Sequence, residues 1–226
     1  MKQFETKDIF IFWGAKGSSK LRVKDKDLSA AEATKLTDPS IKLLKQTHSN
    51  IGFNVGKEFN SFSKKGDFLI TNQPSLSIGV KTADCTPIAF FDPQNKSIGV
   101  AHAGWQGTVK KISEATIKAM SLNFGSNPKD ILIWIGPSAK TCCYEVSQDF
   151  YTNLKPEFID SCLVQKDNKI YFNQQNYNKL VLLEAGILEA HINLDFNECT
   201  ICNSNYGSYR REGANSPLQI SYIMIK

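Results

Sequence analysis

Apolar residues in the middle of the chain fall into short runs, some of which alternate with polar residues. Four such runs occupy residues 66–72, 76–84, 87–92 and 97–104. Glycine, proline, asparagine or aspartate separates them, and short runs bounded in this way are typical of β-strands. Residues 92–95, Asp-Pro-Gln-Asn, predict a turn that joins two of these strands as a hairpin.

The spacing of apolar residues changes to that of a helix after Gly107. The positions that fit this spacing are Val109, Ile112, Thr116, Ala119 and Met120. Gly125 is a suitable helix terminator. We expect Ser147 to cap a second helix through about Leu154, and a third helix from Asn176 to Glu184, with Gly186 as its terminator.

Two further strands are predicted near residues 130–136 and 218–226, whereas residues 157–169 favour no element. Strands and helices are therefore interleaved, and neighbouring strands look antiparallel. This order favours a domain with a mixed sheet, of the α+β or α/β class. The length of 226 residues fits one large domain or two small ones.

Composition restricts the classes of function. The chain is 41% hydrophobic and carries a formal charge of +5, but its lysines are scattered and do not form the basic patch expected of a nucleic-acid-binding protein. No apolar run reaches about 18 residues, so we expect no membrane span. The first residues lack the features of a signal peptide, which favours a cytoplasmic location, where cysteines stay thiols or bind metals.

Three chemically active residues follow or end predicted strands. His48 lies in Gln-Thr-His-Ser-Asn, Cys85 follows Ala-Asp, and His102 ends an apolar run. If they converge, two imidazoles and a thiolate suit zinc with one open coordination position. Asp84 would then serve as an acceptor behind the ligands or as a proton carrier. Without a metal, Cys85 and His102 would instead form a nucleophile–base pair.

The remaining histidine and the paired cysteines are interpreted as structural. His191 lacks a glycine-rich or polar turn around it. Cys199 and Cys202 have Cys-x-x-Cys spacing, but the adjacent Cys142 and Cys143 do not have the spacing of the usual second pair in a zinc knuckle. Structural thiols are the simpler interpretation.

Five motifs together resemble one family. In order from about Gln46 to Gly213 they read QTHSN, TADCTPIAFFD, AHAGWQGT, IGPSAKTCCYEV and SYRREG. These motifs resemble the YfiH/YlmD-like proteins, also called multicopper polyphenol oxidoreductases or laccase-domain proteins. The resemblance implies one layered α+β domain over residues 1–226, with mixed sheets flanked by helices and similar to a toxin-type cysteine hydrolase domain.

The resemblance also implies a site and an activity. It implies that His48, Cys85 and His102 bind zinc. We expect these three residues and Asp84 to carry out catalysis. The implied activity is phosphorolysis of adenosine, inosine, guanosine or methylthioadenosine, with adenosine deamination as a further activity. The substrate-binding residues that we expect are Gly104, Trp105, Gln106, Tyr144, Tyr209, Arg210 and Arg211, with one tyrosine stacked on the purine.

The chain departs from the family pattern at two places. Gln106 stands where the family has arginine, and residues 12–19 contain Lys16 but no arginine. If the family arginines hold phosphate, glutamine does not replace their charge-assisted donors. Phosphorolysis would then depend on Lys16, Arg210 or Arg211, whereas deamination needs only water.

Three alternatives stay open from the sequence. The first is a polyphenol oxidase with copper in the same site, although three histidines are too few for a full multicopper laccase. The second is a metal-free cysteine hydrolase or amidase that edits peptidoglycan precursors. The third is a zinc-stabilised binding module without activity.

Overall fold

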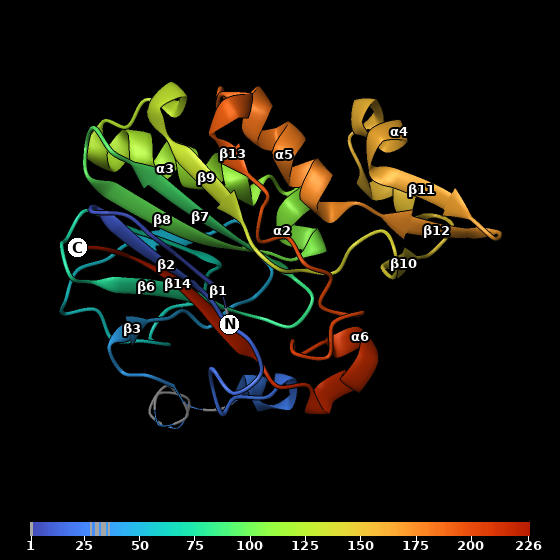
Figure 1. The fold of residues 1–226 in the computed structure, drawn as a ribbon, viewed down its shortest axis with the longest axis horizontal. Helices are drawn as coiled ribbons and strands as arrows, with labels where there is room; N and C mark the ends of the chain where they lie inside the picture. Colours follow the sequence, from blue (N-terminus) through green and yellow to red (C-terminus); the bar gives the residue numbers. More distant parts are fainter. Residues whose placement is uncertain (1, 28, 30–31, 33–34, 36) are drawn as a thin grey trace.

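The strands form three sheets in the computed structural model, which describes residues 2–27, 29, 32, 35 and 37–226 (Figure 1). The first sheet has five strands, in the order β1 (Lys2–Glu5), β2 (Ile9–Trp13), β14 (Gln219–Ile225), β6 (Ser77–Thr82) and β3 (Ile41–Lys42). The predicted strand at the C-terminal end is therefore confirmed. It lies in the middle of this sheet and is antiparallel to both β2 and β6.

The second sheet has six strands and contains the predicted hairpin. Its order is β13 (Ile192–Asn193), β9 (Leu132–Ile135), β7 (Thr86–Asp92), β8 (Ser97–Ala103), β5 (Phe68–Thr71) and β4 (Gly52–Asn54). Strands β7 and β8 pair antiparallel around the turn at 92–95, with Pro87 opposite His102. The outer pairs, β4 with β5 and β13 with β9, are parallel, so the sheet is mixed as expected.

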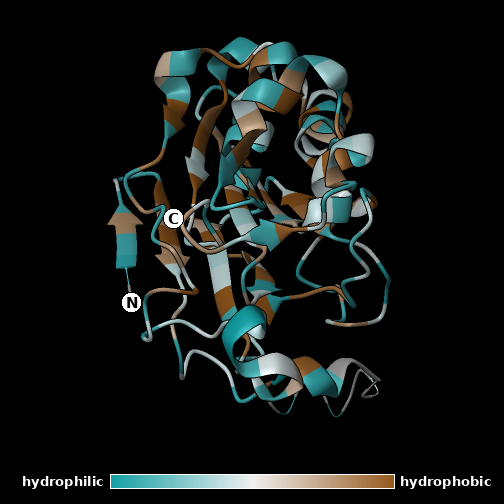
Figure 2. Cartoon of the chain, turned by 90° about the vertical axis from the view of Figure 1, so that its right-hand side faces the viewer, coloured by the Kyte–Doolittle hydropathy of each residue, from teal (hydrophilic) through white to brown (hydrophobic). Residues whose placement is uncertain are grey.

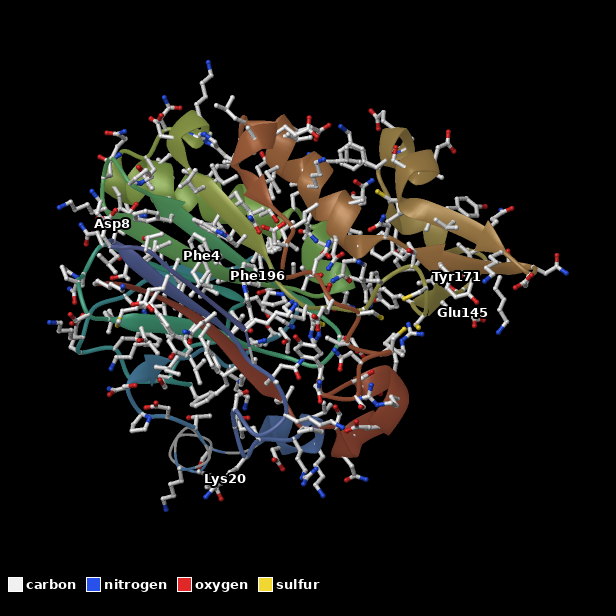
Figure 3. The ribbon with its side chains drawn as sticks, viewed as in Figure 1. Phe4, Asp8, Lys20, Glu145, Tyr171 and Phe196 are labelled. Carbon is white, nitrogen blue, oxygen red and sulfur yellow. The ribbon has the colours of Figure 1, made fainter. Side chains whose placement is uncertain are left out.

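The two large sheets pack face to face around an apolar core. Alternating residues of β2 point into it, with Ile9, Ile11 and Trp13 buried. Ile98 and Val100 of β8 face the same core from the opposite sheet. Figure 2 shows hydrophobic residues concentrated on the strands at the centre of the molecule. Phe4 of β1 packs on Trp134 and Phe196 at the edge of this core (Figure 3).

Helices cover the other face of the six-stranded sheet. The helix α3 (Ile112–Phe124) contacts β8 and ends at Gly125, whose φ of 72° is the left-handed conformation that glycine adopts readily. The helix α5 (Gln174–Glu184) begins two residues earlier than predicted, because Asn173 caps it by accepting from the Asn176 N–H. Figure 1 shows α2 (Trp105–Val109) next to these helices. The α+β class with layered mixed sheets is thus confirmed.

The predicted helix from Ser147 to Leu154 is wrong in type. Phe150–Asn153 forms a short 3-10 helix (η3), and the Ser147 side chain does not cap it. Lys155 precedes Pro156 and is extended, which prevents a longer helix.

The segment 157–169, for which no element was predicted, contains most of a small hairpin. It holds α4 (Ile159–Cys162) and β11 (Leu163–Lys166), and β11 pairs with β12 (Lys169–Phe172). Together with β10 (Glu145–Val146), these strands form the third sheet, and α6 (Tyr209–Glu212) lies near it. The other 3-10 helices are η1 (Val23–Asp27), η2 (Pro128–Asp130), η4 (Pro156–Phe158), η5 (Glu189–His191) and η6 (Gly213–Asn215). Among the described residues, no helix is long and apolar enough to span a membrane.

Candidate active site

His48 is presented by a loop between β3 and β4 that is folded around the carboxylate of Asp67. That carboxylate accepts hydrogen bonds from the backbone N–H groups of Thr47, His48 and Ser49 and from the Ser49 hydroxyl, at 2.6–3.2 Å. His48 has a φ of 58°, in the left-handed region that non-glycine residues rarely adopt. The buried carboxylate offsets the cost of this backbone strain and fixes the direction of the ring.

Cys85 lies where the chain leaves the five-stranded sheet and enters the six-stranded sheet. It stands between β6 and β7, directly after Asp84, whose φ is 84°. Asp84 is buried, and its carboxylate accepts from the Thr200 and Ser208 hydroxyls and from the Arg210 N–H. These bonds fix the turn that carries the thiol.

His102 is near the end of β8, on the strand face that carries Ile98 and Val100. Because strand side chains alternate, its ring points between the two large sheets. It is 3% exposed, and its Nδ1 lies 2.9 Å from an oxygen of Asp67. That bond leaves Nε2 as the atom available to a ligand.

The three side chains meet. The Cys85 Sγ is 3.8 Å from His48 Nε2, the two imidazole centroids are 4.8 Å apart, and one candidate ligand atom from each residue lies within 4.8 Å of the others. Zinc bonds of about 2.0–2.3 Å place tetrahedral ligand atoms about 3.3–3.8 Å apart. A Cβ at Gly104 would lie 2.5 Å from the His48 ring and 3.0 Å from the Cys85 sulfur. The donor set, the carboxylate behind His102 and the space kept by Gly104 fit a tetrahedral metal.

Electrostatics couple Cys85 to His102. Burial raises the pKa of the Cys85 thiol, but the charge and hydrogen bond of His102 outweigh it and lower this pKa to about 6. Burial likewise opposes the imidazolium, yet Cys85 and Asp67 raise the pKa of His102 to about 9. With no cation bound, a thiolate–imidazolium pair is favoured near neutral pH, which is the charge state of a nucleophile–base pair.

A cavity of about 580 Å³ opens beside this group. Its walls include all three candidate ligands and five other predicted site residues, namely Asp84, Trp105, Tyr144, Tyr209 and Arg210. The Arg210 guanidinium lies 4.9 Å from the centre of the Tyr144 ring and donates to the Glu145 carbonyl. Burial raises the pKa of Tyr144, so its hydroxyl stays protonated.

Three predicted or suggested cations and donors do not line the cavity. Arg211 donates to the carbonyls of Thr200, Ile201 and Tyr206 and thereby holds a loop together. Gln106 is exposed on α2, and Lys16 pairs with Glu212. Substrate binding by Arg211 or Gln106 is therefore not supported by their position.

Sequence reasoning missed several residues of the site. Asp67, rather than Asp84, bonds to a histidine of the group; the only local signal was a carboxylate directly before an apolar strand. Arg22, Lys45 and Lys81 also line the cavity and give it positive charge. Their signal was weak, since isolated basic residues are common on protein surfaces.

Comparison with known proteins identifies the family of the chain. The model of the family described as multi-copper polyphenol oxidoreductase laccase matches residues 14–226. The chain belongs to this family. It is 36% identical over 191 residues to the purine nucleoside phosphorylase LACC1 of Homo sapiens, an alignment that covers 81% of the chain and 43% of that relative. It is 33% identical over 186 residues to a purine nucleoside phosphorylase of Clostridium acetobutylicum, with 81% and 76% of the two chains covered.

Solved structures of similar proteins have the same fold. The Bacillus licheniformis protein YfiH superimposes with a TM-score of 0.76 at 28% identity, covering 90% of this chain and 80% of that one. A Neisseria meningitidis protein superimposes with a TM-score of 0.80 over 100% and 98% of the two chains; at 21% identity it is evidence for the fold alone. The chain spans less than half the length of the human relative.

Proposed function

We propose that the protein is a zinc-dependent purine nucleoside phosphorylase. The observation that carries the proposal is the convergence of His48, Cys85 and His102 on a cavity lined by both cations and aromatic rings. Relatives that carry the name purine nucleoside phosphorylase support the substrate class. The proposal includes a cytoplasmic location, where the Cys85 thiol stays reduced.

The cavity walls suit the two substrates of phosphorolysis. Arg210, Arg22, Lys45 and Lys81 supply positive charge for a phosphate ion. They take the place of the family arginine that Gln106 replaces. Trp105, Tyr144 and Tyr209 offer aromatic surface to a purine.

Phosphorolysis exchanges one bond at C1′ of the ribose for another. An oxygen of phosphate forms a bond to C1′ of the ribose while the bond from C1′ to the purine nitrogen breaks, and the bond electrons leave with the base. The protonated hydroxyl of Tyr144, which lines the cavity, would donate a hydrogen bond to a bound group. Zinc held by His48, Cys85 and His102 would act as a Lewis acid toward a substrate oxygen. Asp67 would keep His102 oriented, and Asp84 would keep Cys85 and Arg210 in register.

A substrate assay with two controls tests this function. The zinc-loaded protein is incubated with a mixture of purine nucleosides with and without phosphate, and products are separated by chromatography. We expect free base and ribose 1-phosphate only when phosphate is present, and no turnover by Cys85→Ala, which also loses zinc. Cys162→Ala, which removes a buried thiol away from the cavity, should stay active.

Other products would contradict the proposal in identifiable ways. Inosine formed from adenosine without release of base would show deamination. Base released equally without phosphate would show hydrolysis. Full activity of Cys85→Ala in metal-free buffer would exclude a role for the metal. Oxidation of a phenol dependent on added copper, with no nucleoside turnover, would favour a polyphenol oxidase.

A further inference from the structure

Four cysteines from two distant segments gather at a second place in the molecule. Cys142 and Cys143 lie in the connection between β9 and β10, and Cys199 and Cys202 lie between β13 and α6. One sulfur from each lies within 4.8 Å of all the others. In the sequence these residues form two distant pairs, and the adjacent Cys142 and Cys143 lack the usual spacing of a zinc-binding pair, but the fold joins them into one group of four.

The four sulfur atoms form one compact group. Zinc–sulfur bonds of about 2.3 Å place the four sulfurs of a tetrahedron about 3.8 Å apart. The Cys202 Sγ lies 3.5 Å from Cys142 Sγ and 2.9 Å from Cys143 Sγ. The first distance is close to this spacing, and the second is shorter than it but longer than the about 2.0 Å of a disulfide bond. Cys202 thus approaches two partners at once, as a shared ion requires.

The backbone around the group is already folded to present the sulfurs. Ser138 and Cys199 form a bridge between the two segments. The Asn203 N–H donates to the Cys199 carbonyl, which closes a turn over the Cys-x-x-Cys sequence. The backbone N–H groups of Lys140 and Cys202 donate to the Cys199 sulfur. These contacts hold the Cys-x-x-Cys segment against the segment that carries Cys142 and Cys143.

We propose that Cys142, Cys143, Cys199 and Cys202 bind a zinc ion as a closed tetrathiolate site. Four protein ligands leave no coordination position for water or substrate, so this site is structural, unlike the three-ligand group at Cys85. The proposal is independent of the phosphorylase function, because it rests on the cysteine cluster alone.

The cysteine cluster lies next to residues of the cavity wall. Cys143 directly precedes Tyr144, and the segment that follows Cys202 continues to Tyr209 and Arg210. Both segments therefore supply residues to the cavity wall. Figure 3 shows sulfur atoms close to the labelled Glu145, whose carbonyl accepts from Arg210. An ion at the cluster would hold the two segments of this wall together.

Metal analysis of the full chain, without an affinity tag, tests the proposal. We expect two zinc ions per chain, matching the two ligand groups, by elemental analysis. Cys202→Ser should keep one ion and Cys85→Ser should also keep one, whereas Cys162→Ser, the matched control for loss of a thiol, should keep both. A single ion in the unaltered protein that disappears in Cys85→Ser and persists in Cys202→Ser would overturn the proposal.

A second measurement decides the question even if Cys202→Ser does not fold. Unaltered protein loaded with cobalt in place of zinc should show the intense sulfur-to-metal charge-transfer absorption of a tetrathiolate, and Cys142→Ser should weaken it. Cys85→Ser should retain most of it. Absence of this absorption would overturn the proposal. So would an intact mass of the freshly isolated protein that is lower than that of the reduced chain by the hydrogens lost when two disulfides form.

Discussion

At the scale of single residues, Asp67 is connected to both histidines of the candidate active site. It accepts from the backbone N–H of His48 and from the ring of His102. Burial raises its pKa, but His102 and Ser49 outweigh burial and hold it well below the usual range. The carboxylate therefore stays charged while it orients both rings.

Replacement of Asp67 by asparagine should weaken zinc binding at His48, Cys85 and His102. Loss of a partner behind a metal ligand typically lowers metal affinity by about 10- to 100-fold. Competition with a coloured chelator measures this change. Asp92→Asn is the control, because Asp92 is also buried but bonds to Gln94 and Asn95 at the β7–β8 turn. Equal losses of affinity in the two variants would refute a specific role for Asp67.

Lys81 should make phosphate binding depend on pH. Burial lowers its pKa to about 8, with a smaller contribution from Lys45, although Asp67 opposes the shift. Lys81 is thus charged below this pH and neutral above it, so KM for phosphate should rise as pH increases through 8. Steady-state kinetics from pH 6.5 to about 9.5 would show the effect. Lys81→Met should have a high KM that depends less on pH; an unchanged profile in this variant would rule Lys81 out.

The same shift has a consequence for stability. The pKa of Lys81 is lower in the folded protein than the ordinary lysine value of 10.5. Between these two values the unfolded chain binds more protons than the folded chain. The contribution of Lys81 to the free energy of unfolding is therefore unfavourable at low pH and is relieved as pH rises through this window.

At the scale of elements, the turn from β8 to α2 controls the space at the candidate metal site. Gly104→Ala would bring a Cβ within 2.5 Å of the His48 ring and 3.0 Å of the Cys85 sulfur. We expect zinc affinity to fall by at least about tenfold, since ligands that shift no longer share one ion. Gly99→Ala, in β8, is the matched control; its Cβ meets Thr116 at 3.1 Å and should affect stability but not zinc.

The elements differ in how far sequence alone determines them. The β7–β8 hairpin and α3 were predictable, because Pro93 and Gly125 mark their ends and the apolar period is local. The insertion of β14 between β2 and β6 was not, since β14 pairs with two strands that lie far earlier in the chain. Local pattern does not encode such pairings.

The candidate site shows the same limit. The motifs singled out His48, Cys85 and His102, which lie together in the structure because all three follow or end strands. Asp67 and Lys81 belong to the site only through tertiary contacts, and nothing in their flanking residues distinguishes them from ordinary polar positions. The cysteine cluster was missed for a similar reason, since its two pairs meet only in the folded chain.

At the scale of the whole molecule, the core between the two large sheets should carry much of the stability. Ile223 of β14 is fully buried there. Ile223→Ala should lower the free energy of unfolding by about 2–5 kcal/mol, as for other large-to-small changes in cores. Urea denaturation followed by circular dichroism measures it. Ile51→Ala should change little, because Ile51 is 54% exposed; similar losses in both variants would contradict this location of the core.

Two of the three candidate ligands stand where the chain passes from one large sheet to the other. His48 lies between β3 and β4, and Cys85 lies between β6 and β7. An ion bound there would link the two sheets to each other. Its removal should therefore let the two layers separate more often beside the ligands, whereas its own exchange can proceed through the cavity that opens beside them.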